Sequence, residues 1–240
     1  MRLVQEIKKL VEMATSMRIA LVEDDPHQAQ LMESWIGEAG FSSRIYNDGN
    51  GFLKSIAKES YDLLILDWML PDLDGLEVIS RYRSIANGAP SVMVVTVKAD
   101  ERDAVRALKK GADAYLRKPL RHKEFVARIK ALGRRAEQRN LTEVSPFEID
   151  IENREISLRG EPIKLTAREF EMALFLFQRR DQLVSRNHIL ETIWGNDRLL
   201  LSRTVDTHIS RLRKKLQLDG KSGWRLISVY RRGYSLQKVT

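Results

Sequence analysis

The sequence of 240 residues contains no cysteine. Disulfides and thiolate metal sites are therefore excluded, and the composition is typical of a protein in a reducing cytoplasm. Long apolar runs are also missing, since none approaches the roughly 18 residues that a membrane-spanning helix needs. Residues 1–17 carry three basic side chains but no continuous apolar segment, which argues against a signal peptide. We expect a cytoplasmic protein that does not cross a membrane.

Acidic residues are scarce near the end of the chain. Residues 203–240 hold 10 Lys and Arg against 2 Asp and Glu, so this segment alone has a charge of +8. A surface of this charge attracts a polyanion, and nucleic acid is the first candidate. A solvated surface that only aids solubility would give the same count, so charge alone leaves both interpretations open.

In the first half of the chain, short apolar runs alternate with helix-length segments. This pattern predicts a parallel sheet with helices on both faces, in a doubly wound (βα)5 domain over residues 17–136. Five reactive side chains lie at or just beyond the ends of these runs: Asp24, Asp25, Asp67, Thr96 and Lys118. Because ligands of such sheets bind beyond the carboxyl ends of the strands, we expect the five side chains to converge on one crevice.

The chemistry of this set favours phosphoryl transfer. Two carboxylates about 4 Å apart repel by roughly 4 kcal/mol at an effective dielectric near 20, so the cluster needs protons, water or a cation. Oxygen ligands without His or Cys favour Mg²⁺. Lys118 and Thr96 supply a cation and a donor for phosphoryl oxygens, and one carboxylate would be the nucleophile. The alternative is that these acids are ordinary strand-end caps.

The remainder of the chain predicts three further parts. Residues 1–16 place apolar side chains on one helical stripe, as a leader or an extra helix would. Residues 137–145 are polar and aperiodic, as in a linker. Residues 146–240 predict an α+β domain in which short antiparallel strands precede three helices and a final hairpin. Thr166 and Glu169 have capping-box spacing at the first helix, and Ser185 precedes the second.

Residues 17–136 resemble the receiver domain of two-component response regulators. The motifs VEDD, LDWMLPDLDG, VVT and LRKP carry the resemblance. It implies that Asp67 is the phosphoacceptor, contacted through its phosphoryl group by Thr96 and Lys118. It also implies a switch formed by Thr96 and Tyr115, and a cis peptide before Pro119. The Mg²⁺ ligands that it implies are Asp24, Asp25, Asp67 and the backbone carbonyl of Met69.

The segment RTVDTHISRLRKKL predicts a helix with two different faces. At 100° per residue, Val205, Ile209, Leu212 and Leu216 share an apolar face that should pack on the core. The opposite face suits the major groove of double-stranded DNA, where Arg can bind guanine and Lys can bind phosphate. The DNA-binding residues predicted on or beside it are Arg203, Thr204, Thr207, Ser210, Arg211, Arg213 and Lys214.

Residues 142–240 resemble the winged helix-turn-helix effector of the OmpR/PhoB class. Residues 195–202 match the loop that contacts RNA polymerase in some relatives. In the segment SVYRRGY, Tyr230 stands where the family often has a minor-groove arginine. We predict that Arg231 or Arg232, one or two positions later, reaches the minor groove instead.

The resemblance implies a homodimer on activation, yet the predicted pairing face departs from the family pattern. Glu124 and Arg128 match expected ion-pair partners, but Ala104 and Ala114 replace the usual counterparts. Exposed bridges contribute only about 0–1 kcal/mol each, so packing and other pairs, such as one made by Asp113, would still permit a dimer.

The sequence as a whole predicts a transcriptional regulator that accepts a phosphoryl group on Asp67 from a sensor histidine kinase, and not an enzyme. An alternative is a DNA-binding regulator whose receiver dimerises without phosphorylation, because Val97 replaces the small residue usual after the switch hydroxyl and would narrow the path to Asp67. A phosphatase of the haloacid-dehalogenase type is disfavoured, because Met69 occupies the position of its acid/base aspartate.

Overall fold

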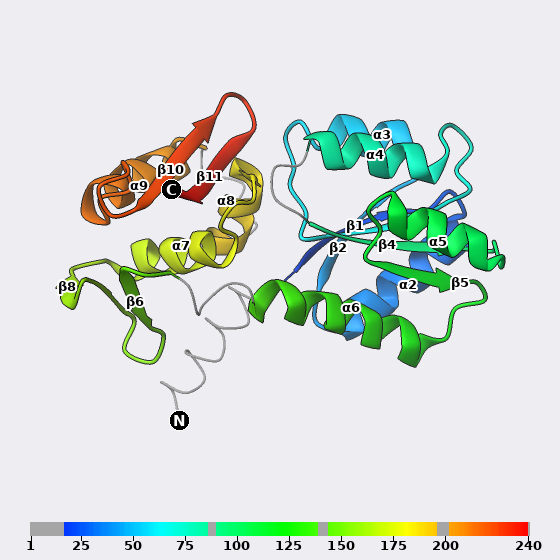
Figure 1. Cartoon of the computed structure of the whole chain (residues 1–240), viewed down its shortest axis with the longest axis horizontal. Helices are drawn as coiled ribbons and strands as arrows, with labels where there is room; N and C mark the ends of the chain where they lie inside the picture. The colour runs from blue at the N-terminus through cyan, green and yellow to red at the C-terminus, as the bar shows by residue number, and fades with distance from the viewer. Residues whose placement is uncertain (1–16, 86–89, 139–143, 196–201, 240) are drawn as a thin grey trace. The chain divides into compact units, whose positions relative to one another are not determined.

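The computed structural model describes residues 17–85, 90–138, 144–195 and 202–239. The chain divides into two compact units, with the division between Ala136 and Glu137 (Figure 1). The predicted leader, residues 1–16, lies outside the described residues, as do residues 196–201 of the predicted polymerase loop and 139–143 of the predicted linker. In the described part of the chain, no helix is long and apolar enough to cross a membrane.

The N-terminal unit is built on a parallel sheet. Among the described residues, its five strands have the order β2-β1-β3-β4-β5. The strands are β1 (Arg18–Val22), β2 (Ser42–Tyr46), β3 (Leu63–Asp67), β4 (Ser91–Thr96) and β5 (Ala114–Arg117). The helices are α2 (Pro26–Glu38), α3 (Gly49–Ser55), α4 (Gly75–Ile85), α5 (Glu101–Lys109) and α6 (His122–Gln138). The predicted (βα)5 doubly wound architecture is confirmed.

Two apolar cores hold the helices on opposite faces of this sheet (Figure 1). On one face, Met32 and Ile36 of α2 and Phe125 of α6 pack against the strands. On the other, Phe52 of α3 and Ile79 of α4 belong to the second core. Strands β1 and β3 are buried along their whole length, which explains why their sequences are continuous apolar runs, apart from Arg18 and Asp67 at the ends, instead of alternating.

The amino-terminal edge of the sheet is held together by Arg83 of α4. Its Nη2 donates to the Gly111 carbonyl at 2.6 Å and to Asp113 Oδ2 at 2.8 Å, and its Nη1 donates to the Pro90 carbonyl. Asp113 Oδ2 also accepts the Val92 N–H at 2.8 Å. One guanidinium therefore joins α4, the start of β4 and the turn before β5.

The C-terminal unit is an α+β domain, as predicted. In the part that the structure describes, antiparallel strands form two sheets with the orders β6-β7-β8 and β10-β11-β9. The strands are β6 (Phe147–Asp150), β7 (Glu155–Leu158), β8 (Glu161–Ile163), β9 (Val184–Ser185), β10 (Trp224–Val229) and β11 (Gly233–Lys238). The helices are α7 (Ala167–Gln178), α8 (Arg186–Trp194) and α9 (Ser202–Lys215). Helix α6 extends two residues into the segment predicted as a linker.

Local capping rules fix where the helices of this unit begin. Thr166 Oγ1 accepts the Glu169 N–H at 3.3 Å, and Glu169 Oε2 accepts the Thr166 N–H at 2.8 Å, so the predicted capping box is present. Ser185 caps α8 by accepting the His188 N–H at 3.1 Å. The apolar face predicted for α9 is buried as expected, with Val205, Ile209 and the residues that follow them in the stripe inside the core.

Candidate functional site

An acidic cluster lies where the carboxyl ends of β1 and β3 meet. Strand β1 pairs with β2 on one side and β3 on the other, so the chain's strand order reverses beside it. Among the described residues, Glu23, Asp24 and Asp67 each offer a carboxylate oxygen within 4.8 Å of the others. Glu23 and Asp67 are buried, whereas Asp24 is exposed. The cluster is therefore both preorganised by the sheet and open to solvent on one side.

The structure places Asp25, a predicted Mg²⁺ ligand, outside this cluster. Its Oδ1 accepts the His27 N–H at 2.9 Å and the Gln28 N–H at 3.3 Å, which makes it the N-cap of α2. Its Oδ2 accepts from Gln28 Nε2 at 3.1 Å, and the hydrogen bonds from Gln28 lower the pKa of Asp25. Glu23 occupies the place in the cluster that the sequence analysis gave to Asp25. The signal was present, because an aspartate followed by Pro26 is a typical helix start.

Lys118 lies between the two buried carboxylates. Its Nζ is 2.9 Å from both Glu23 oxygens and 2.7 Å from Asp67 Oδ2. Burial alone would lower the pKa of Lys118, but the hydrogen bonds to Asp67 and Glu23 outweigh it and the pKa is raised. Burial raises the pKa of Glu23 despite the same contact. Lys118 is therefore a fixed positive charge beside Asp67, and the predicted cis peptide to Pro119 is present.

The donor set fits Mg²⁺. All three side chains of the cluster offer carboxylate oxygen, which a hard cation prefers, and the exposed Asp24 leaves room for the waters that Mg²⁺ retains. Asp67 Oδ1 accepts the Met69 N–H at 2.9 Å, so the backbone after the strand folds back towards the same carboxylate. Met69 is 55% exposed.

Thr96 and Tyr115 are connected through one loop residue, Lys98. Thr96 is buried at the end of β4, one position beyond the residue that pairs with Asp67. Its Oγ1 accepts the Lys98 N–H at 3.3 Å. The Tyr115 hydroxyl donates to the Lys98 carbonyl at 2.9 Å. The structure therefore connects both predicted switch residues through Lys98, a shared contact that the sequence does not indicate.

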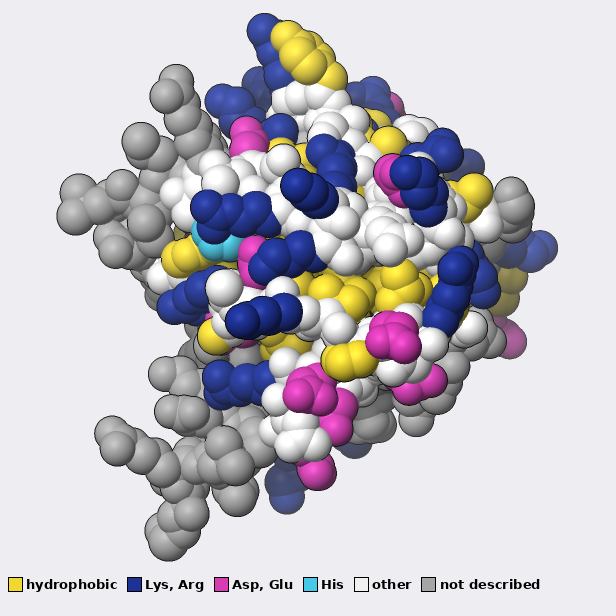
Figure 2. Space-filling view, turned by 90° about the vertical axis from the view of Figure 1, so that its left-hand side faces the viewer, with side chains coloured by type: hydrophobic (Ala, Val, Ile, Leu, Met, Phe, Trp, Pro, Cys, Tyr) yellow, Lys and Arg dark blue, Asp and Glu magenta, His cyan; other side chains and the backbone are white. Residues whose placement is uncertain are grey.

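Helix α9 presents a polar face opposite its buried stripe. Four of the predicted DNA-binding residues on it are exposed: Thr207, Ser210, Arg211 and Lys214. Thr204 is half-buried. Arg203 lies in α9, but its side chain is outside the described part. Figure 2 shows the side of the molecule that includes this unit, with Lys and Arg side chains spread over much of it.

Arg213 is placed differently from the other predicted DNA-binding residues. It is half-buried, and its Nε donates to the Leu226 carbonyl at 2.8 Å while Nη2 donates to Ser228 Oγ at 2.8 Å. Both acceptors lie on β10. Arg213 therefore joins α9 to the C-terminal hairpin, which is a structural role that its position on a helical projection does not show.

The two candidate minor-groove arginines both lie in the hairpin turn but differ in exposure. Arg231 is exposed, has a left-handed φ of 57°, and its guanidinium carbon lies 5.1 Å from the centroid of the Tyr230 ring. Arg232 is half-buried, and burial lowers its pKa. The Tyr230 side chain is 81% exposed. The geometry favours Arg231 over Arg232 for contact with a ligand at the turn.

Asp113, suggested above as an ion-pair partner in a dimer, already has a partner within its own chain. Asp113 already forms an ion pair with Arg83 within the same chain, with 2.8 Å between Oδ2 and Nη2. Glu124 and Arg128 are exposed on α6, and Ala114 is buried in β5. Asp113, which was suggested as a partner across a dimer face, is thus engaged with Arg83 within its own chain.

Comparison with known proteins matches both halves of the chain. Residues 19–130 match the response regulator receiver domain, and residues 160–236 match the C-terminal domain of transcriptional regulatory proteins. The DNA-binding response regulator MtrA of Mycolicibacterium smegmatis is 34% identical over 219 residues, which cover 90% of this chain and 95% of that protein. The transcriptional regulatory protein YclJ of Bacillus subtilis is 36% identical over 213 residues, covering 85% and 93%.

A solved structure agrees with the fold of the first unit. The signal receiver domain of a putative LuxO repressor protein from Vibrio parahaemolyticus has a TM-score of 0.50 and 26% identity, covering 53% of this chain and 98% of that one. The two matched domains thus follow one another in the chain, with the receiver domain first. The chain belongs to the two-component response regulators that join a receiver domain to a DNA-binding domain and act as regulators of transcription.

Proposed function

We propose that Asp67 accepts the phosphoryl group that a sensor histidine kinase delivers to this regulator. The supporting observation is the contact between Lys118 Nζ and Asp67 Oδ2 at 2.7 Å, inside a cluster of two further carboxylates. A carboxylate oxygen of Asp67 attacks phosphorus, the bond from phosphorus to the histidine nitrogen breaks, and that nitrogen retains the electron pair. Lys118 then balances charge on the phosphoryl oxygens, and Thr96 donates its hydroxyl hydrogen to one of them.

Glu23, Asp24, Asp67 and the Met69 carbonyl are the proposed ligands of Mg²⁺. When bound, the ion would neutralise negative charge on the transferring phosphoryl group. Glu23 replaces Asp25 in this set, because Asp25 caps α2 and Glu23 lies in the acidic cluster. Lys118 already offsets part of the charge of Glu23 and Asp67, so the exposed Asp24 is the ligand that costs least to bring to the ion.

Binding of double-stranded DNA is assigned to the exposed side of α9 and to the hairpin turn. Thr207, Ser210, Arg211 and Lys214 offer donors to base edges and phosphates, and Arg231 offers a cation to the minor groove. Phosphorylation would shift the receiver towards a conformation that forms a homodimer, which raises the effective concentration of two DNA-binding units on paired half-sites. Contact with RNA polymerase through residues 195–202 and a cytoplasmic location complete this proposal.

The test is a measurement of intact mass after incubation with Mg²⁺ and a small acyl phosphate. The full-length protein is expected to gain one phosphoryl group, and Asp67→Asn to gain none. Asp72→Asn is the matched control, since this exposed carboxylate accepts the N–H groups of Gly49 and Asn50 and lies outside the acidic cluster. A wild-type protein that never gains mass on Asp67 would contradict the proposal.

A second candidate is regulation without phosphorylation, in which the receiver serves only to dimerise. The observation that favours it is Val97, whose β-branched side chain is 60% exposed directly after Thr96. DNA affinity measured with and without beryllofluoride and Mg²⁺ separates the two candidates. Phosphorylation-dependent regulation predicts tighter binding with the phosphoryl analogue, and the second candidate predicts no change. Faster phosphorylation of Val97→Ala would show that Val97 narrows the path to Asp67.

A further inference from the structure

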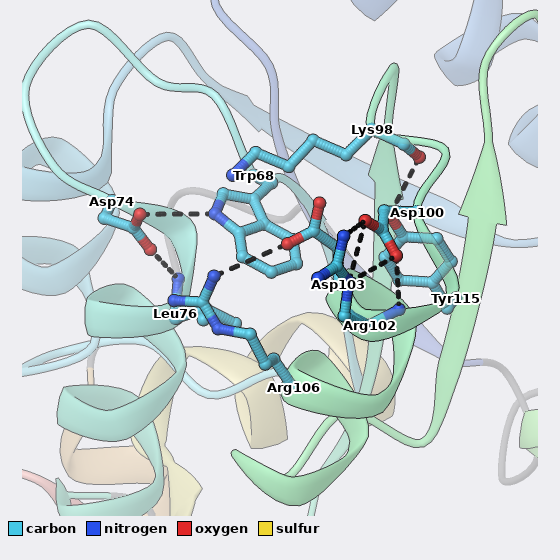
Figure 3. A network of polar contacts seen from close by, with 9 residues as sticks. All are labelled: Trp68, Asp74, Leu76, Lys98, Asp100, Arg102, Asp103, Arg106 and Tyr115. Carbon is cyan, nitrogen blue, oxygen red and sulfur yellow. Dashed lines mark hydrogen bonds and ion pairs between the residues drawn. The ribbon is translucent and has the colours of Figure 1, made fainter.

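Trp68, which directly follows the proposed phosphoacceptor, is held in place on several sides (Figure 3). Its side chain is 2% exposed, and its indole N–H donates to Asp74 Oδ2 at 3.2 Å. Asp74 Oδ1 in turn accepts the Leu76 N–H at 2.8 Å, in the first turn of α4. The Tyr115 ring meets the indole edge to face, with 6.5 Å between centroids. The indole is therefore a fixed platform beside Asp67.

The Lys98 ammonium lies over the Trp68 ring. Its Nζ lies 4.2 Å from the centroid of the Trp68 ring, within the range of a cation–π contact. Figure 3 shows the Lys98 side chain extending over the indole, while the Lys98 carbonyl points to the Tyr115 hydroxyl. The guanidinium of Arg106 is more distant, at 5.7 Å from the same centroid, and is paired with Asp103. Lys98 is thus the closer of these two cations to the ring.

The backbone of Lys98 contacts both switch residues. Its N–H donates to Thr96 Oγ1, and its carbonyl accepts from the Tyr115 hydroxyl. Because Thr96 Oγ1 accepts this N–H, its own hydrogen stays available for donation to another acceptor. A displacement of Lys98 would alter both hydrogen bonds and would withdraw the ammonium from Trp68. Three contacts of one residue therefore join the chain after Asp67, Thr96 and Tyr115.

We propose that Lys98 is a positioning residue for phosphoryl transfer to Asp67, acting through its ammonium contact with the Trp68 ring. The contact holds the loop after β4 so that the Thr96 hydroxyl is directed at the phosphoryl group. This role rests on the proposed function of Asp67. A cation over a buried indole stabilises by an amount that corresponds to a rate change of about threefold to tenfold when the contact is removed.

The experiment measures the rate at which the full-length protein gains mass from a small acyl phosphate at saturating Mg²⁺. Lys98→Met keeps the length of the side chain but removes the charge, and is expected to slow phosphorylation about threefold to tenfold. Lys98→Arg, which restores a cation, is expected to recover most of the rate. Lys109→Met is the matched control, because Lys109 is an exposed lysine of α5, and its rate should equal that of wild type.

A double-variant cycle separates positioning from a general effect on folding. Trp68→Leu should slow phosphorylation as Lys98→Met does, and the double variant should be no slower than the slower single variant, because one contact is lost only once. The apparent Mg²⁺ affinity of Lys98→Met should stay at the wild-type value, and the variant should remain folded at the assay temperature. Equal rates for Lys98→Met and wild type, or single effects that multiply in the double variant, would overturn the role of Lys98 alone. Failure of the wild type to gain mass would instead overturn the proposed function of Asp67.

Discussion

The acidic cluster permits a direct comparison of two carboxylates that lie two positions apart in the sequence. Glu23→Gln and Asp25→Asn each remove one negative charge and keep the shape of the side chain. Glu23 belongs to the cluster, whereas Asp25 caps α2. Asparagine is itself a good N-cap, so Asp25→Asn should preserve both the helix and the Mg²⁺ site. The two variants therefore differ in whether the lost charge faces the ion.

The size of the expected difference follows from the spacing of the ligands, whose carboxylate oxygens lie within 4.8 Å of one another, so that an ion held among them would be nearer to each than that. A unit charge about 5 Å from a divalent ion contributes about 1.7 kcal/mol at a dielectric of about 80. This corresponds to about a twentyfold change in affinity. A lower effective dielectric near the buried Glu23 would increase this loss of Mg²⁺ affinity, so twentyfold is a lower bound for Glu23→Gln. Asp25→Asn should change the affinity less than about twofold.

The assay follows the rate of mass gain on Asp67 as a function of Mg²⁺ concentration, which gives an apparent dissociation constant for the ion. Melting temperatures measured in parallel show whether either variant disturbs the fold. The assignment of Glu23 would be refuted if Asp25→Asn weakened Mg²⁺ binding as much as Glu23→Gln, or if Glu23→Gln had no effect. The first result would show that Asp25 leaves the α2 cap when the ion binds.

Three further predictions concern other contacts. Arg213→Ala should lower the free energy of unfolding, measured in urea, by about 1–3 kcal/mol, because it leaves two acceptors on β10 unpaired. Arg211→Ala should leave stability unchanged and should reduce the slope of log DNA affinity against log salt concentration by about one. Burial would raise the pKa of Glu169, but the hydrogen bonds from Lys215 and Thr166 together outweigh it, and the pKa lies below its usual 4.5. The stabilising contribution of Glu169 is therefore complete above pH 4.5 and is lost as the pH falls through the lowered pKa. Calorimetry should therefore show that Glu169→Gln lowers the melting temperature at neutral pH and has little effect in strong acid. Gly75→Ala should cost about 1–3 kcal/mol in urea denaturation, because an added Cβ would lie 2.7 Å from Trp68 Cα.

Features that depend on neighbouring residues were predictable from the sequence. The capping box of Thr166 and Glu169 obeys a rule of spacing within one helical turn, and the structure contains it. The uniform apolar runs predicted a sheet buried on both faces, and β1 and β3 are buried throughout. The buried stripe of α9 was predicted from the helical spacing of its apolar residues. In each case the information lies within a few residues of the chain.

Features that depend on distant contacts were not predictable in the same way. Glu23 and Asp25 are both carboxylates near the end of β1. Pro26 marks Asp25 as a helix start, but the contacts of Glu23 with Lys118 and its place beside Asp67 depend on residues far away in the sequence. Arg213 lies at the border of the polar face of α9 in projection, and β10 decides its partner. The ammonium of Lys98 contacts the ring of Trp68, and the two residues follow neighbouring strands, β4 and β3. No local sequence pattern indicates this contact.

The guanidinium of Arg83 has a consequence for spectroscopic work on this protein. It joins α4 to the starts of β4 and β5 at the edge of the sheet remote from Asp67, through the Gly111 carbonyl and the carboxylate of Asp113. A spin label or fluorophore attached near that edge would serve as a stationary reference point. A partner label on the loop that carries Lys98 would then register displacement on phosphorylation as a change in one interprobe separation.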